Sequence, residues 1–134
     1  MKGMIKSMDM SSPLARARGH GASKEGGTHH WWSQRLSAMA LVPLSLWFVF
    51  SVVALAGVDQ AAFAGWVSEL GNMVLMSLFV IALFSHIGQG MQVVIEDYVH
   101  AEPAKLAMLL MVKAFIYVGG ASCLVSIVIV AFGN

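Results

Sequence analysis

The chain has 134 residues, of which 58% are hydrophobic and only 11% are charged. Soluble domains carry about a quarter charged residues, so this composition indicates a protein whose solvent is a lipid bilayer. The length allows a few membrane spans, and we expect no separate soluble catalytic domain. The formal net charge is only +1. Because nucleic-acid binding requires a basic face, no nucleic-acid partner is expected.

The N-terminal segment, residues 1–30, is rich in Gly, Ser, Lys, Arg and His and shows no apolar period. We expect it to form a polar arm, extended or loosely ordered. The first long apolar run begins only at Leu36, too far behind the basic start for a cleavable secretory signal. Arg16 and Arg18 among serines and alanines leave a mitochondrial transit peptide as an alternative, which the acidic residues of the segment weaken.

Three apolar runs are each long enough to cross a membrane as a helix. They are residues 36–58, 71–95 and 106–132. At about 1.5 Å per residue, such runs span a hydrocarbon core of about 30 Å. The predicted fold class is an all-α membrane protein whose transmembrane domain, residues 31–134, contains three helices. Lys113 in the third run can extend outward along its stem and is assigned no chemical role. Cys123, in the same run, is expected to be a small buried hydrophobe.

The distribution of basic residues predicts the orientation. Six of the eight Lys and Arg residues precede or begin the first run, Lys105 lies between the second and third, and the loop 59–69 has none. By the positive-inside rule, the N-terminus and the second loop face the cytoplasm or the mitochondrial matrix. Trp31 and Trp32 at one end of the first run, and Trp66 near the opposite surface, fit aromatic belts.

His86 is the histidine that falls inside a predicted span. An ionisable side chain in hydrocarbon is costly, so it is a functional hypothesis by default. Ala82 and Gly90 share its helical face, with Ser85 and Gly88 close by, and these small residues leave room for a flat macrocycle. Two interpretations remain open: a metal or haem ligand, and a histidine that hydrogen-bonds another helix.

The remaining histidines lie outside the predicted spans. They are His20, His29, His30 and His100. A haem with two axial imidazoles inside the membrane therefore cannot be completed by this chain. Its second ligand must come from another subunit.

The end of the second run carries a phenol and a carboxylate, Tyr98 and Asp97. Tyr98 lies twelve residues beyond His86, about 18 Å along a helix, which places it near the membrane surface. A phenol there can donate a hydrogen bond to a quinone carbonyl, and Asp97 can orient it or deliver protons. Arg35 is expected at the same interface, where it can pair with a haem propionate or a quinone oxygen. Each residue also has a simpler interpretation. Tyr98 can be an interfacial belt tyrosine, Asp97 a solvated carboxylate at the helix end, and Arg35 a charge that sets the topology.

Two segments together resemble a known family. They are HHWWSQR, residues 29–35, which opens the first span, and HIGQGMQVVIEDY, residues 86–98. This pattern resembles the small hydrophobic membrane anchor of succinate dehydrogenase, respiratory complex II. The family pattern is a histidine, a glycine four residues on, and an Asp-Tyr pair ending twelve residues after the histidine. The likeness covers about residues 14–132 and is closest to alphaproteobacterial and mitochondrial forms.

The resemblance implies roles for particular residues. His86 would be one axial ligand of haem b, and so the metal ligand of this chain, with the other ligand supplied by the larger cytochrome b anchor subunit. The three helices would then form half of a heterodimeric haem-binding bundle. Tyr98 would hydrogen-bond ubiquinone with Asp97 beside it. Arg35 and His29 match positions that the family places near the haem propionates and the quinone pocket.

The implied function is membrane anchor of succinate:ubiquinone oxidoreductase. Succinate is then oxidised on a flavoprotein partner, electrons pass through an iron-sulfur partner, and ubiquinone is reduced where that partner meets these helices. The expected location is the bacterial inner membrane, surrounded by lipid, with the mitochondrial inner membrane as alternative. A haem-free structural anchor of a soluble redox complex is a competing hypothesis. A small transporter subunit is another, but it requires polar residues along each span, and the first span offers only serines.

Overall fold

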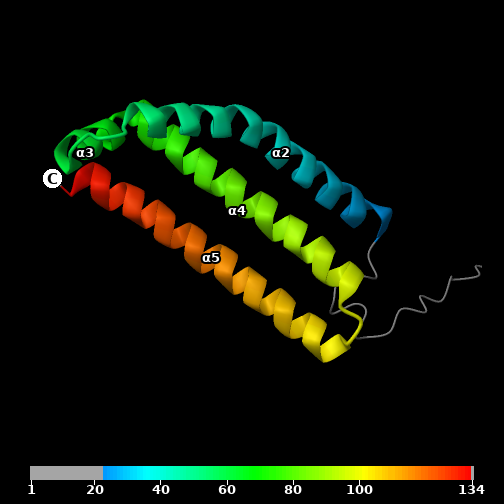
Figure 1. Ribbon diagram of the computed structural model, residues 1–134. Coiled ribbons are helices and arrows are strands. Elements are labelled where there is room, and N and C mark those ends of the chain that lie inside the picture. The colour runs from blue at the N-terminus through cyan, green and yellow to red at the C-terminus, as the bar shows by residue number, and fades with distance from the viewer. Residues whose placement is uncertain (1–22, 134) are drawn as a thin grey trace, which may run out of the picture. The chain divides into compact units, whose positions relative to one another are not determined.

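The computed structural model describes residues 23–133, and every regular element in this part of the chain is a helix (Figure 1). The helices are α2 (Ser23–Ala54), α3 (Gln60–Ser68), α4 (Leu70–Tyr98) and α5 (Glu102–Phe132). Internal contacts divide the chain into two units, Met1–Trp31 and Trp32–Asn134. The second unit holds most of α2 and all of α3, α4 and α5.

Three of these helices are long and apolar enough to cross a membrane. The candidate spans are His29–Ala54, Leu70–Tyr98 and Glu102–Phe132, with 26, 29 and 31 residues. At 1.5 Å per residue they measure about 39 to 47 Å, so their ends extend beyond a hydrocarbon core of about 30 Å. The predicted all-α architecture with three membrane helices is confirmed.

The boundaries of the first helix differ from the prediction. α2 begins at Ser23, so the expectation of an extended arm is wrong for residues 23–30, and the rest of the arm lies outside the described residues. Once the apolar run has nucleated a helix, each further residue adds a backbone hydrogen bond, which lets the helix continue into polar sequence. At the other end α2 stops at Ala54, and Gly57 takes a positive φ of 86° in the following turn, a conformation natural to glycine.

The connection between the first two spans contains the short helix α3, which the sequence analysis treated only as a loop. The Asp59 side chain caps α3 by accepting a hydrogen bond of 2.8 Å from the backbone N–H of Ala62. Ala64 and Val67 are buried, since α3 packs against α4 and α5. Trp66, expected in an aromatic belt, stacks on Trp47 of α2 with ring centroids 5.8 Å apart.

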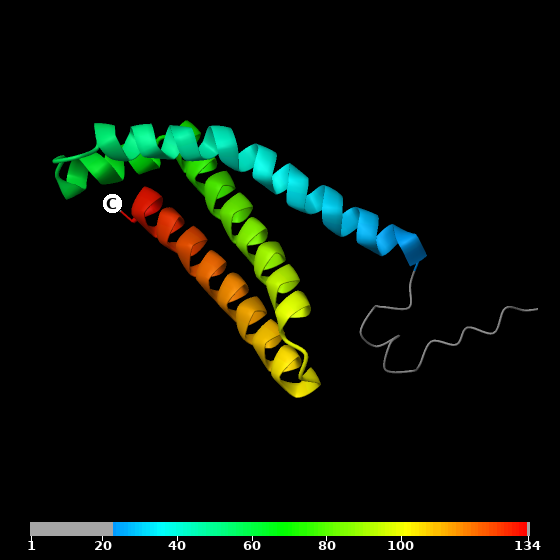
Figure 2. The ribbon, with the colours of Figure 1, turned by 45° about the vertical axis from the view of Figure 1, so that its right-hand side comes forward.

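Helices α4 and α5 run side by side in opposite directions (Figures 1 and 2). Small residues let them approach closely, as is common in membranes. A Cβ on Gly119 would lie 2.9 Å from Cε1 of Phe84, and one on Gly88 would lie 3.3 Å from Cγ1 of Ile116. Glycine at these two positions is therefore part of the α4–α5 contact.

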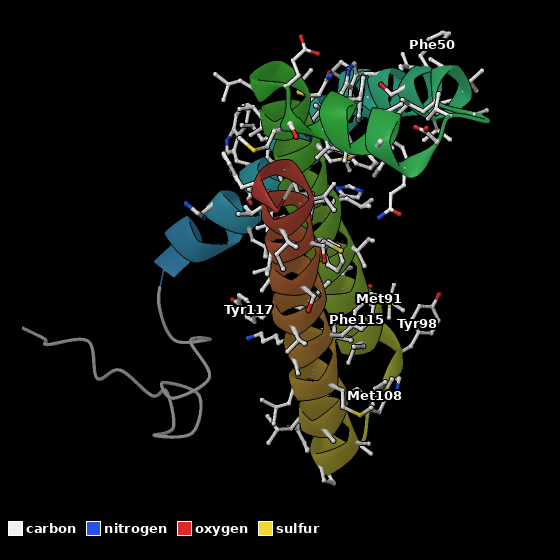
Figure 3. The ribbon with its side chains drawn as sticks, turned by 90° about the vertical axis from the view of Figure 1, so that its left-hand side faces the viewer. Phe50, Met91, Tyr98, Met108, Phe115 and Tyr117 are labelled. Carbon is white, nitrogen blue, oxygen red and sulfur yellow. The ribbon has the colours of Figure 1, made fainter. Side chains whose placement is uncertain are left out.

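Most large apolar side chains of the described residues remain exposed. The buried hydrophobic residues are Ala64, Val67 and Ile95. Tyr98 and Tyr117 project to opposite sides of the α4–α5 pair (Figure 3). Cys123 is exposed on α5, so the expectation that it is buried is wrong for this chain by itself. Its apolar run faces outward because α5 packs on α4 along one side. The outer faces of the helices are suited to lipid or to other apolar helices.

The contact at Gly119 gives a test of the α4–α5 packing. Gly119→Val forces a side chain into the Phe84 ring, and overpacking of this kind costs about 1–3 kcal/mol. Gly71→Val makes the same change where no neighbouring atom lies within 4 Å. We expect Gly119→Val to lower the thermal midpoint of the detergent-solubilised protein by several degrees and Gly71→Val to leave it nearly unchanged. Equal midpoints in the two variants would contradict this packing.

Candidate functional site

His86 lies well inside α4, half-buried, and is in hydrogen-bonding contact with α2. Its Nδ1 is 3.1 Å from the hydroxyl oxygen of Ser37. The two residues are 49 positions apart in the sequence. One of the two ring nitrogens is therefore used in a contact between helices.

A second polar contact between α2 and α4 lies one helical turn away. The Nε2 amide of Gln89 donates a hydrogen bond of 3.0 Å to the hydroxyl oxygen of Ser33. Ser33 and Ser37 are four residues apart on α2, and His86 and Gln89 are three apart on α4, so each pair shares one helical face. The two contacts run in antiparallel register and stabilise the helix pair by about 0.6 kcal/mol each, the average for such bonds in a bilayer.

An apolar contact extends the same register toward the other end of the two helices. Phe48 of α2 stacks on Phe79 of α4, with ring centroids 4.6 Å apart and an interplanar angle of 17°. Between these contacts, Pro43 interrupts the hydrogen-bond ladder of α2, since proline has no backbone N–H. The pairing of α2 with α4 is thus held by polar contacts at one end and ring stacking at the other.

The two glycines near His86 differ in what surrounds them. Gly88 is in contact with Ile116 of α5, whereas a Cβ on Gly90 would meet no atom within 4 Å. Close to His86, the Oε1 atom of Gln89 is buried and has no hydrogen-bond partner among the described residues. The space expected for a flat group therefore lies at Gly90, and an unused acceptor lies one turn from the histidine.

The side chains available as metal ligands limit the kind of metal group that His86 can bind. Within residues 23–133 there is no cluster of three or more His, Cys, Asp or Glu side chains able to hold a metal ion. A haem needs no such cluster, because its porphyrin supplies four nitrogens and the protein supplies only axial ligands. A lone histidine beside open space fits an axial ligand, and it does not fit a zinc or iron site built from protein ligands alone.

Asp97 and Tyr98 are the last residues of α4 before its C-cap. Both are exposed, Tyr98 to 79%. At 100° per residue, Tyr98 is turned about 120° from His86, while Asp97 is three turns along nearly the same face. The structure therefore does not bring the phenol and the imidazole together. They lie at two levels of one helix, about 18 Å apart.

Arg35 and His29 are exposed residues of α2. Arg35 is two positions from Ser37, about 3 Å along the helix and on the opposite side. Since Ser37 contacts His86, Arg35 lies near the level of the histidine rather than that of Tyr98. His29 belongs to the unit Met1–Trp31.

The sequence analysis missed the partners of the site, namely Ser33, Ser37 and Gln89. Ser37 was counted only among the serines of the first span, and Ser33 and Gln89 appeared only within the two family-motif segments. A signal was present in the sequence, because Ser33 and Ser37 stand one helical turn apart, as do His86 and Gln89. Matching such pairs between spans would have suggested the α2–α4 contact.

Three long apolar helices, with polar side chains meeting between the first two, define a multi-pass membrane protein. Residues 8–120 match the family described as succinate dehydrogenase/fumarate reductase transmembrane subunit. The chain belongs to this family, which confirms the resemblance inferred from the sequence.

Individual relatives agree with the family match. The succinate dehydrogenase hydrophobic membrane anchor subunit of Rickettsia bellii is 32% identical over 107 residues, covering 80% of this chain and 85% of the relative. The protein of the same name from Paracoccus denitrificans is 30% identical over 98 residues, covering 73% and 75%. The succinate dehydrogenase membrane anchor subunit of Reclinomonas americana is 29% identical over 97 residues, covering 70% and 81%. No solved structure gives a significant match.

Proposed function

We propose that this chain is the membrane anchor subunit of a succinate:ubiquinone oxidoreductase, and that it binds haem b and contributes to the site of ubiquinone reduction. Membership of the family supports the anchor role. The observation that carries the haem assignment is the geometry of His86. Its Nδ1 is engaged by Ser37, and its Nε2 has no hydrogen bond to the described residues, so one nitrogen remains for a metal.

In this proposal, His86 would hold haem b through Nε2, and a larger cytochrome b anchor subunit would supply a further ligand. Bound haem b supplies one-electron redox chemistry inside the membrane. Gly90, where an added Cβ would meet no atom within 4 Å, would leave room for the flat group. Arg35, near the level of His86, would pair with a haem propionate, and the family motif assigns His29 to the same role.

The quinone site is proposed at the end of α4. The Tyr98 phenol donates a hydrogen bond to a ubiquinone carbonyl and holds the ring in place. Asp97, beside it, orients the phenol or passes protons toward the quinone. Succinate oxidation takes place on the flavoprotein partner, and an iron-sulfur partner delivers the electrons at this surface. The residues of this chain bind and orient the quinone and move protons toward it. They do not oxidise succinate themselves.

The proposed location is the bacterial cytoplasmic membrane with the N-terminus on the cytoplasmic side. The excess of Lys and Arg before the first span supports this orientation through the positive-inside rule. The end of α4 that carries Tyr98 then faces the cytoplasm. The flavoprotein and the iron-sulfur protein bind at that surface.

One observation favours the alternative of a haem-free anchor. The bond between His86 and Ser37 is a satisfactory partner for a buried imidazole without any metal. In that case the histidine only joins two helices, and the chain tethers a soluble redox complex. The haem proposal requires in addition that Nε2 has a metal to bind.

The anchor role is tested by purification. A tagged chain extracted in mild detergent from its native membrane is expected to carry a flavoprotein, an iron-sulfur protein and a second membrane subunit in equal amounts. Mass spectrometry of the purified sample identifies them. Recovery of the chain without a flavoprotein and an iron-sulfur protein would overturn the anchor assignment.

The haem assignment is tested with His86→Ala in the same purified complex. We expect loss of the b-type absorption bands of the reduced sample, because the variant has no axial nitrogen in the membrane. His100→Ala is the matched control, since His100 is an exposed histidine in the α4–α5 connection, and it should retain the spectrum. A b-type spectrum of wild-type intensity in His86→Ala would leave the haem-free anchor as the better proposal.

The quinone assignment is tested with the two tyrosines of the chain. Tyr98→Phe removes only a hydroxyl, and loss of one hydrogen bond of about 1 kcal/mol should lower succinate to ubiquinone turnover about fivefold. Haem content should not change. Tyr117→Phe is the control, because Tyr117 is similarly exposed, 74% against 79%, but projects to the other side (Figure 3). Equal turnover in wild type and Tyr98→Phe would remove Tyr98 from the site.

A further inference from the structure

Two consecutive hydrogen bonds connect the ring of His86 to the backbone of α2. The Ser37 hydroxyl lies 3.1 Å from Nδ1 of His86, and it donates a hydrogen bond of 2.9 Å to the backbone carbonyl of Gln34. A serine oxygen can accept two hydrogen bonds, but it carries a single proton to donate. The direction of the bond to His86 follows from where that proton goes.

When the Ser37 hydroxyl directs its proton at the Gln34 carbonyl, as in the 2.9 Å bond between them, the serine oxygen acts as the acceptor toward the ring. Nδ1 of His86 must then carry a proton and donate it. A neutral imidazole holds only one ring proton, so Nε2 keeps its lone pair. This is the tautomer that can bind a metal through Nε2.

The contact also sets the strength of the ligand. A ring N–H that donates to an oxygen makes the opposite nitrogen more basic and fixes the plane of the ring. Here the accepting oxygen donates in turn to a carbonyl, and consecutive hydrogen bonds of this kind polarise one another. Ser37 therefore acts on the far nitrogen of His86 without touching any group bound there.

The pairing of α2 with α4 does not depend on this bond alone. Ser33 and Gln89 are joined one turn away, and Phe48 stacks on Phe79 farther along. Removing the hydroxyl of Ser37 should leave these contacts in place. The effect of Ser37 on the ring can thus be separated from its effect on helix packing.

We propose that Ser37 is a positioning residue that fixes the tautomer and orientation of His86 for ligation of haem iron and thereby sets the redox potential of the haem. This inference rests on the proposed haem-binding function. It assigns no contact between Ser37 and the haem.

The test uses three variants of the whole purified complex: Ser37→Ala, Ser37→Thr and Ser33→Ala. For each, haem content is measured by absorption, and the midpoint potential is measured by redox titration of the same bands. Ser37→Ala is expected to weaken haem binding about 10- to 100-fold, the usual effect of losing such a partner. The midpoint potential of the haem that remains should rise, because a less basic imidazole stabilises ferric iron less.

Ser37→Thr keeps a hydroxyl that can bond a carbonyl of the preceding turn, so its potential and haem content should match the wild type. Ser33→Ala removes the neighbouring interhelical bond and should also leave the potential unchanged. If Ser37→Ala keeps the wild-type potential and haem content while His86→Ala loses the haem, this inference is wrong and the proposed function stands. If the wild-type complex has no haem that depends on His86, both this inference and the haem assignment are wrong, while the anchor role is tested separately by the purification.

Discussion

The rest of the structure follows from one requirement, which is that the half-buried imidazole of His86 finds a hydrogen-bond partner inside a membrane, where water is absent. The bilayer core offers no hydrogen-bond partners, so a polar side chain there must find one in another helix or in a ligand. His86 finds one at Ser37, and this contact, with the bond between Ser33 and Gln89 and the stacking of Phe48 on Phe79, sets which faces of α2 and α4 meet. The bond to Ser37 uses one ring nitrogen and leaves the other for the haem iron that we propose.

Helix α4 carries both proposed sites, and their separation follows from helix geometry. His86 and Tyr98 are twelve residues apart, about 18 Å along the axis. The packing of α4 on α5 through Gly88 and Gly119 holds α4 as a straight support between them (Figure 2). One helix would therefore keep the proposed haem and the proposed quinone at different depths.

The chain leaves large apolar surfaces exposed, and among its described residues His86 is the histidine that lies far from the ends of a candidate span. Both features suit a subunit of a larger membrane assembly. Lipid can cover an apolar surface, but it cannot supply a second axial nitrogen. The proposed haem site therefore requires a second polypeptide, and the exposed faces of the long helices offer places for it to bind.

The sequence by itself determined the three spans, the family and the spacing of His86 and Tyr98. These follow from apolar length and from the fixed rise of a helix, which are local properties. The three-dimensional packing adds that Ser37 meets His86, that Arg35 lies near the level of the histidine, and that α3 packs against α4 and α5. The pairing of α2 with α4 joins residues 49 positions apart, and hydrophobic patterning alone does not select it, because apolar side chains lie around most of each span.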